Sequence, residues 1–167
     1  ESGVIATLVY HPEFILHTDY LKPGYFYATD NGCIYWAISE LYKAGVENID
    51  ALNISNMLNS NKAVKQTIQN YNLPSLQEYI DLCAETARGT LEEYKLLAQR
   101  VVTLSYKRDL IRNMSALEKL CFDKEMSLGE LTKHRNDIIA KLDEKYCRKW
   151  GADLTLCGHF HGGTIRI

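Results

Sequence analysis

Apolar residues recur along most of this chain at intervals of three or four residues, the spacing of an amphipathic helix. No alternating strand pattern or hairpin turn signal precedes residue 150. The pattern predicts helices over residues 4–10, 31–44, 62–71, 76–87, 91–121 and 128–147, and a short helix containing Ile54, Met57 and Leu58. We therefore expect an all-α fold: a compact helical bundle, then a long antiparallel helical hairpin, with a short irregular or strand-like C-terminal tail.

Three predicted helices begin with a capping box, in which a hydroxyl and a carboxylate three residues later cap the helix reciprocally. The boxes start at Ser75, Thr90 and Ser127. No proline follows Pro74, so nothing interrupts the two long helices after it.

The helices over 91–121 and 128–147 are joined by only Phe122 to Met126, which is short enough to force antiparallel neighbours. At 1.5 Å per residue the first arm reaches about 45 Å, beyond the extent of a small globular body. Part of its apolar stripe therefore needs a partner outside the chain. The candidate oligomer or partner interface consists of Ile111, Met114, Leu117, Leu128, Leu131, Ile138 and Leu142.

The net charge of −2 conceals an asymmetry along the 167 residues. Residues 1–87 carry 4 Lys+Arg against 10 Asp+Glu, whereas residues 88–149 carry 14 against 10. This division agrees with three parts: a helical globular body over 1–90, the hairpin over 91–147, and an extraneous or flexible tail over 148–167.

Several classes are excluded by composition. No apolar run is long enough to span a membrane, and the opening residues, without Met, are typical of an excerpted chain rather than a signal peptide. The 5 cysteines form no CxxC pair, which favours buried free thiols in a reducing cytoplasm over a disulfide scaffold.

The motifs of common catalytic sites are missing. A phosphate-binding loop needs Gly followed by Lys, and no glycine here precedes a lysine. We identify no catalytic and no cofactor-binding residue. His11, His17 and His134 are isolated and are interpreted as solvated side chains. The basic residues of 88–149 are interspersed with acidic ones, so a solvated helix face is favoured over direct DNA binding.

The order of motifs in residues 1 to about 147 resembles the N-terminal domain of DnaB-family replicative DNA helicases. That domain has an apolar first helix, L-x-P-x-x-F-Y, I-[FY]-x-A-I-x-x-L-x-x-x-G, a hydrophobic–Asp pair, Y-[IL]-x-x-[LC], and a stretch from a Tyr to R-x-L-I. The corresponding residues here are 4–9, 21–27, 34–45, 49–50, 79–83 and 94–111. One departure is Asn31, where the family often has His.

The resemblance implies a non-catalytic scaffold that supports oligomerisation within a primosome. In the family, hairpins pair between subunits to build a dimer, or a hexamer as a trimer of dimers, and the same collar docks primase and in some systems a helicase loader. It further implies a cytoplasmic protein that contacts DNA only indirectly. The chain itself would hold no cofactor, because ATP and Mg²⁺ belong to a RecA-like ATPase domain that these residues do not include.

Residues 151–163 differ from that pattern and resemble the last metal-binding motif of metallophosphoesterases, a strand followed by G-H-x-H-G-G. The resemblance marks His159 and His161 as candidate metal ligands. The motifs that would supply the remaining ligands are absent from the sequence. Three interpretations stay open: an artefact of gene fusion or chain assembly, a natural tail of chance similarity, and a half-site completed by another subunit.

The sequence therefore favours an oligomerisation and partner-docking domain of a replicative helicase. The alternatives are a fragment of a metal-dependent phosphoesterase and a small DNA-binding regulatory protein.

Overall fold

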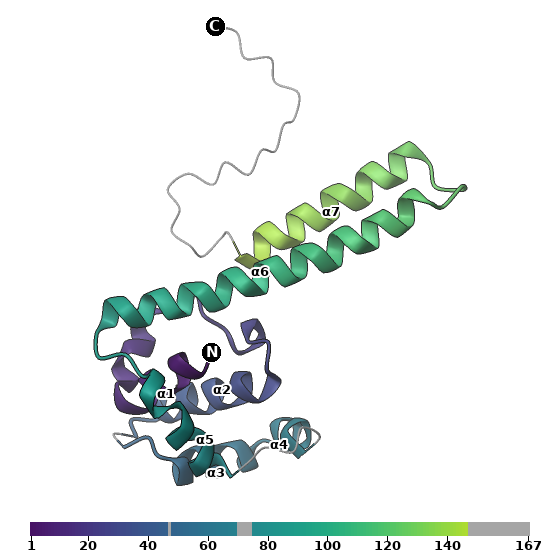
Figure 1. Ribbon diagram of the computed structural model, residues 1–167. Helices are drawn as coiled ribbons and strands as arrows, with labels where there is room; N and C mark the ends of the chain where they lie inside the picture. The colour runs from purple at the N-terminus through teal and green to yellow at the C-terminus, as the bar shows by residue number, and fades with distance from the viewer. Residues whose placement is uncertain (47, 70–74, 147–167) are drawn as a thin grey trace, which may run out of the picture. The chain divides into compact units, whose positions relative to one another are not determined.

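The computed structural model describes residues 1–46, 48–69 and 75–146 (Figure 1). All regular secondary structure in these ranges is helical, which confirms the predicted all-α class. The chain divides into two compact units, Glu1–Ser105 and a second that begins at Tyr106. The predicted tail over 148–167, with His159 and His161, lies outside the described residues.

The first unit, Glu1–Ser105, includes all of residues 1–90, for which a helical body was expected. Its α-helices are α1 (Ser2–Tyr10), α2 (Thr29–Lys43), α3 (Ala51–Ser60), α4 (Lys62–Gln69), α5 (Leu76–Cys83) and the part of α6 (Leu91–Cys121) up to Ser105. Short 3-10 helices cover Pro12–His17, Pro23–Tyr25 and Ala84–Thr86. Helix α1 contacts both α2 and α5, so the first helix lies at the centre of this unit.

The core of the first unit is apolar, and it also contains a hydrogen-bonded pair of buried hydroxyls. Its fully buried side chains include Ile5, Ile34 and Ile54. The hydroxyls of Thr18 and Tyr94 lie 2.9 Å apart, and burial raises the pKa of Tyr94. The Thr18 and Tyr94 hydroxyls are thus hydrogen-bonded to each other, which offsets the cost of removing both from water.

Helix α2 is capped at its C-terminus by residues close in the sequence and at its N-terminus by a residue far away in the sequence. At its C-terminus, Gly45 adopts a φ of 77°, and its N–H donates to the carbonyl of Tyr42 at 3.0 Å. The N–H of Val46 donates to the carbonyl of Leu41 at 3.1 Å, which completes a Schellman motif. At its N-terminus, the carboxylate of Glu1 accepts from the backbone N–H of Tyr27 at 2.6 Å and of Ala28 at 3.2 Å.

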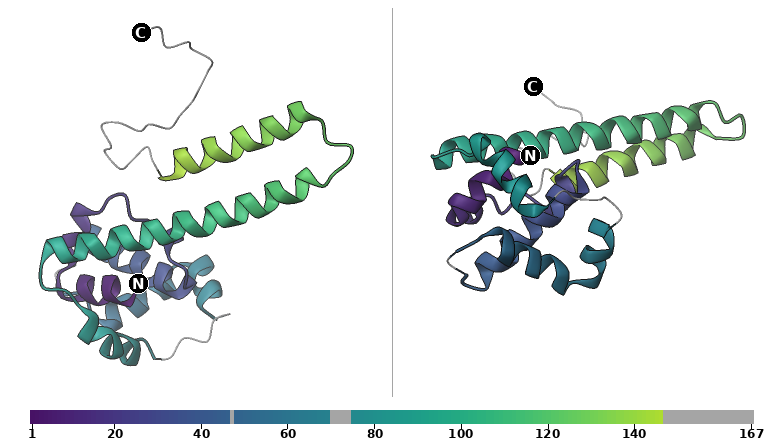
Figure 2. Two further views of the ribbon diagram at one scale, coloured as in Figure 1. Left: turned by 45° about the horizontal axis from the view of Figure 1, so that its top comes forward. Right: turned by 60° about the horizontal axis from the view of Figure 1, so that its bottom comes forward.

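The second unit contains α6 from Tyr106 onward and α7 (Leu128–Tyr146). The two helices run antiparallel, side by side, in all three views (Figures 1 and 2). The predicted boundary near residue 90 falls at the start of α6, whereas the compact units divide further along that helix, between Ser105 and Tyr106.

Candidate functional site

The two arms of the helical hairpin form the candidate site, and a capping box determines where the second arm begins. The Ser127 hydroxyl accepts from the N–H of Glu130 at 3.3 Å, and the Glu130 carboxylate accepts from the N–H of Ser127 at 2.9 Å. The Ser127 hydroxyl, which donates to the Glu130 carboxylate at 2.6 Å, and the Ser127 N–H together hold the pKa of Glu130 below its usual value. The chain therefore leaves α6 at Cys121 and re-enters a helix at Leu128, as the sequence predicted.

Within the hairpin, one row of α6 side chains is shielded from solvent. This inner row repeats every three or four residues and consists of Tyr106, Leu110, Asn113, Leu117 and Leu120, each half-buried. On α7 the shielded apolar positions follow the same helical spacing: Leu131 and Ile138 are half-buried, and Leu142 is only 6% exposed. Matching shielded rows on the two helices indicate that they pack against each other along one seam.

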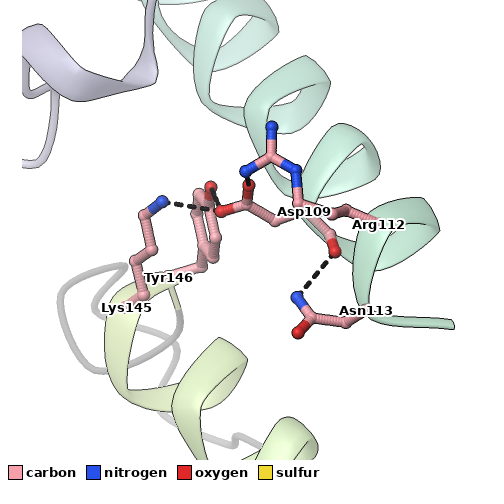
Figure 3. Close-up of polar contacts among 5 residues, drawn as sticks. All are labelled: Asp109, Arg112, Asn113, Lys145 and Tyr146. Atoms are coloured by element: carbon pink, nitrogen blue, oxygen red, sulfur yellow. Dashed lines mark hydrogen bonds and ion pairs between the residues drawn. The ribbon is translucent and has the colours of Figure 1, made fainter. Parts of the chain in front are cut away.

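A polar cluster fastens the two arms at the C-terminal end of α7 (Figure 3). One oxygen of Asp109 accepts from the Nζ of Lys145 at 2.6 Å and from the hydroxyl of Tyr146 at 2.7 Å. The Tyr146 ring in turn meets the Tyr106 ring edge to face, with centroids 5.4 Å apart. We call Asp109, Lys145 and Tyr146 the anchor cluster.

Two neighbouring side chains hold Asp109 from its own helix. Arg112 places a guanidinium nitrogen 3.5 Å from the second carboxylate oxygen, and Asn113 donates to the backbone carbonyl of Asp109 at 2.7 Å. The Arg112 side chain is 80% exposed, so this pair adds little stability. The contacts from α7 are therefore the ones that join the two arms.

The anchor cluster shifts the pKa of its two charged members in opposite directions. Burial by itself would raise the pKa of Asp109, but the hydrogen bonds from Lys145 and Tyr146 lower it overall. Burial would lower the pKa of Lys145, but its hydrogen bonds to Asp109 and Tyr146 raise it overall. Both shifts favour the charged forms, so the ion pair persists across the neutral pH range.

Two apolar side chains of α6 outside the inner row are exposed to solvent. Ile111 is 67% exposed and Met114 45%. We call these two residues the outer row. Ile111 points away from the inner row, whereas Met114, four residues after Leu110 and three before Leu117, borders it.

The seven predicted interface residues fall into two environments. Ile111, Met114 and Leu128 are exposed, the last at 81%. Leu117, Leu131 and Ile138 are half-buried and Leu142 is buried, all within the seam of their own hairpin. The exposed members are accessible to a second chain, whereas the shielded members stabilise the pairing of the arms.

The anchor cluster is not evident from the sequence. Asp109 is one of the acidic residues that are interspersed among the basic ones of 88–149. A carboxylate on the half-buried face of a basic helix is a signal for such a contact, but the sequence does not show that Lys145 and Tyr146, 36 and 37 residues away, are its partners.

Other chemistry is limited in the part of the chain that the structure describes. Within residues 1–46, 48–69 and 75–146, no group of three or more His, Cys, Asp or Glu side chains could hold a metal ion. Cys33, Cys83 and Cys121 are free thiols, and Cys121 is exposed, contrary to the expected burial. None of the described helices is long and apolar enough to cross a membrane.

The chain matches the model of a known protein family. The model of the family described as the DnaB-like helicase N terminal domain matches residues 1–94. No curated protein matches the chain. The matched range covers α1 to α5 and the first residues of α6, and so falls within the first unit.

Proposed function

The chain belongs to the DnaB-like helicase N-terminal domain family, and from this premise we propose that it is a non-catalytic assembly domain of a replicative DNA helicase. In this proposal the hairpin joins copies of the chain into a dimer, or into a hexamer built as a trimer of dimers. The assembled domains then dock primase, and in some systems a helicase loader, and contact DNA only indirectly.

The outer row of α6 is the observation that supports oligomerisation. Its side chains are exposed although the helix also has an inner row that already satisfies the packing needs of the hairpin. An apolar row that its own chain leaves uncovered is typical of a protein interface. A second hairpin laid along this face would bury Ile111 and Met114 and remove their apolar surface from water.

The charges around the outer row suggest how two hairpins would be oriented. Lys107 and Arg112 are exposed on the same stretch of α6, and Glu118 follows one turn beyond Met114. An antiparallel arrangement places Lys107 of one hairpin near Glu118 of the other. A parallel arrangement would place like charges together, which is unfavourable.

The proposal assigns no catalytic step to the chain. Hydrolysis of ATP with Mg²⁺ would belong to a RecA-like domain of the parent helicase. The residues of this chain would instead set the geometry of the assembly and present surfaces to partners.

Sedimentation velocity over a dilution series tests oligomerisation. We expect the 167-residue chain to form a concentration-dependent oligomer at micromolar concentration, and Ile111→Asp with Met114→Asp to shift it toward the monomer. The matched control is Leu52→Asp, because Leu52 is 68% exposed, close to the 67% of Ile111, but lies on α3. Circular dichroism shows whether the variants keep their helices. The proposal would be contradicted if the parent chain stayed monomeric, or if Leu52→Asp reduced oligomerisation as much as Ile111→Asp with Met114→Asp does.

A further inference from the structure

Two adjoining hollows lie on the surface of the first unit, on either side of Pro23 and Trp36, which line both. Their volumes are about 450 Å³ and about 380 Å³. The larger hollow has a neutral lining that includes Phe26 and Val64. The smaller is lined by Leu16, Leu21 and other apolar side chains, together with charged groups. We call the two hollows together the Trp36 groove.

Trp36 and Leu16 are the accessible side chains on which the groove depends, whereas Leu21, Phe26 and Tyr35 of its lining are buried. Most apolar residues of α2, such as Ile34 and Ile38, are fully buried, but Trp36 is only half-buried. Leu16, from the 3-10 helix Pro12–His17, is 67% exposed. A half-buried tryptophan beside apolar hollows is the composition that protein interfaces favour, since Trp is enriched among the residues that dominate binding.

The charged groups of the smaller hollow determine which partner it suits. Asp19 and Glu40 contribute two carboxylates, and Lys43 is the lining cation. Lys43 already binds Glu40, with its Nζ 2.8 Å from the carboxylate oxygen. The Lys43 side chain is 67% exposed, so this pair is weak and an incoming cation can compete with it.

Among the side chains that line the groove, two carboxylates stand against one lysine, so the lining favours a basic segment over an acidic one. An occupant that fits both the apolar lining and this charge is an amphipathic segment with Lys or Arg beside its apolar residues.

We propose that the Trp36 groove docks a cationic amphipathic helix of a partner protein. Apolar side chains of that helix fill the hollows on both sides of Trp36, and its Lys or Arg residues bind Asp19 and Glu40. This inference rests on the proposed partner-docking function and adds the chemistry of the partner's contact segment. The groove lies wholly within the first unit, so it does not depend on the hairpin.

Fluorescence of Trp36 measures the docking directly. The chain has 2 tryptophans, so Trp150→Phe leaves Trp36 as the only tryptophan, and excitation at the long-wavelength edge separates its emission from that of the 11 tyrosines. The probe is a synthetic amphipathic helix of Leu and Lys, and its comparison is the same peptide with Glu in place of Lys. We expect the Lys peptide to shift the Trp36 emission saturably, with an affinity that falls as salt rises, and the Glu peptide to have no effect.

Variants of the groove locate the site. Leu16→Ser should lower the affinity for the Lys peptide about 10-fold, because it removes an apolar side chain that the peptide contacts. Leu52→Ser is the control, because Leu52 is equally exposed, at 68% against 67%, but does not line the groove. Asp19→Asn with Glu40→Gln should weaken binding and flatten its salt dependence.

Several results would overturn the inference: no shift with either peptide, equal binding of both peptides, or equal effects of Leu16→Ser and Leu52→Ser. A Trp36 emission that changes with protein concentration alone would assign the groove to a second copy of this chain instead. The titration is repeated with Ile111→Asp. Peptide binding that persists in Ile111→Asp supports the groove whatever the oligomeric state. If the parent chain oligomerises but does not bind the Lys peptide, the docking groove is overturned while the proposed assembly function stands.

Discussion

Replacing Asp109 with Asn removes the charge at the centre of the anchor cluster but keeps the shape of the side chain. Two hydrogen bonds to the carboxylate are weakened, from the Lys145 Nζ at 2.6 Å and the Tyr146 hydroxyl at 2.7 Å. A hydrogen bond to a charged group contributes about 1.5–3 kcal/mol when buried. The Lys145 side chain is 42% exposed and Asn retains an acceptor oxygen, so we expect a loss of about 1–2 kcal/mol.

Because the contacts join only the two arms, the loss should appear as opening of the hairpin rather than as unfolding of the first unit. A change of 1–2 kcal/mol increases the open population about 5- to 30-fold. Native-state hydrogen exchange of the last backbone amides of α7, up to Tyr146, measures this population. The amides of α1 and α2 should exchange at the parent rate.

The control variant is Asp137→Asn, which makes the same change of charge at an exposed position of α7. It should leave exchange at the end of α7 unchanged. Equal acceleration by the two variants would show that net charge, and not the anchor cluster, determines the opening. Unchanged exchange in Asp109→Asn would refute the reasoning directly.

The same cluster gives a pH dependence with a definite sign. The pKa of Asp109 is lowered, so its contribution is present above the unfolded carboxyl value of about 4 and is lost as pH falls through the folded value. The pKa of Lys145 is raised, so its contribution is present below about 10.4 and is lost as pH rises through the folded value. The ratio of exchange rates between Asp109→Asn and the parent should therefore be constant between these limits and fall toward one outside them.

Three predictions concern the first unit. In Gly32→Ala, the new Cβ would lie 2.5 Å from the carbonyl oxygen of Pro23, and we expect a loss of about 1–3 kcal/mol in thermal unfolding. Tyr94→Phe removes the hydroxyl 2.9 Å from Thr18 and should cost about 1–2 kcal/mol in urea unfolding, with an unchanged m-value. Glu1→Gln should cost about 1 kcal/mol at neutral pH, with the difference vanishing as acid neutralises the parent carboxylate, whose pKa is lowered.

The first two of these have a matched control variant, and the third is checked by its pH dependence. Gly129→Ala, in α7, meets nothing within 4 Å of the new Cβ and should be neutral or stabilising, because Ala favours helix. Tyr10→Phe alters a tyrosine that is 57% exposed and should leave the urea midpoint unchanged. Equal effects of variant and control would refute the close approach at Gly32 or the buried hydroxyl pair. A Glu1→Gln difference that persists in acid would show that the carboxylate charge is not its cause.

Signals carried by neighbouring residues allowed the helices to be predicted. The hydroxyls of Ser75, Thr90 and Ser127 all accept from the N–H three residues later, as expected, because each cap needs only residues within one turn. The expected return bond from the backbone N–H to the carboxylate is seen at Ser127. Helix α2 was predicted to begin at Asn31 but begins at Thr29, because its N-terminal backbone groups are capped by Glu1, which lies 26 residues before Tyr27. A cap from that distance leaves no local pattern.

The α5 region shows a second limit. The helical pattern over 76–87 was read as one helix, but α5 ends at Cys83 and a 3-10 helix covers Ala84–Thr86. The change of helix type accompanies a tertiary contact: the Thr7 hydroxyl accepts from the N–H of Arg88 at 2.9 Å. Long-range contacts of this kind override a local periodicity.

For the candidate site, the sequence shows which helix positions of the hairpin are apolar, but not which of them are buried between the arms and which are exposed. Residue type marks Ile111 and Leu142 equally as apolar helix positions, yet the first is 67% exposed and the second 6%. The difference comes from the pairing of the two arms, which depends on side-chain packing across the seam. The Trp36 groove went unrecognised for the same reason, since its lining comes from separate segments of the first unit.

The central claim is that the outer row of α6 contacts a second copy of this chain, and site-specific photo-crosslinking tests it most directly. A benzophenone amino acid replaces Ile111 in one sample and Leu52, the equally exposed position on α3, in another. The account predicts a covalent dimer from position 111, with the adduct on residues 106–146 of the second chain, and little dimer from position 52. Monomer alone, or equal dimer yields from both positions, would contradict it.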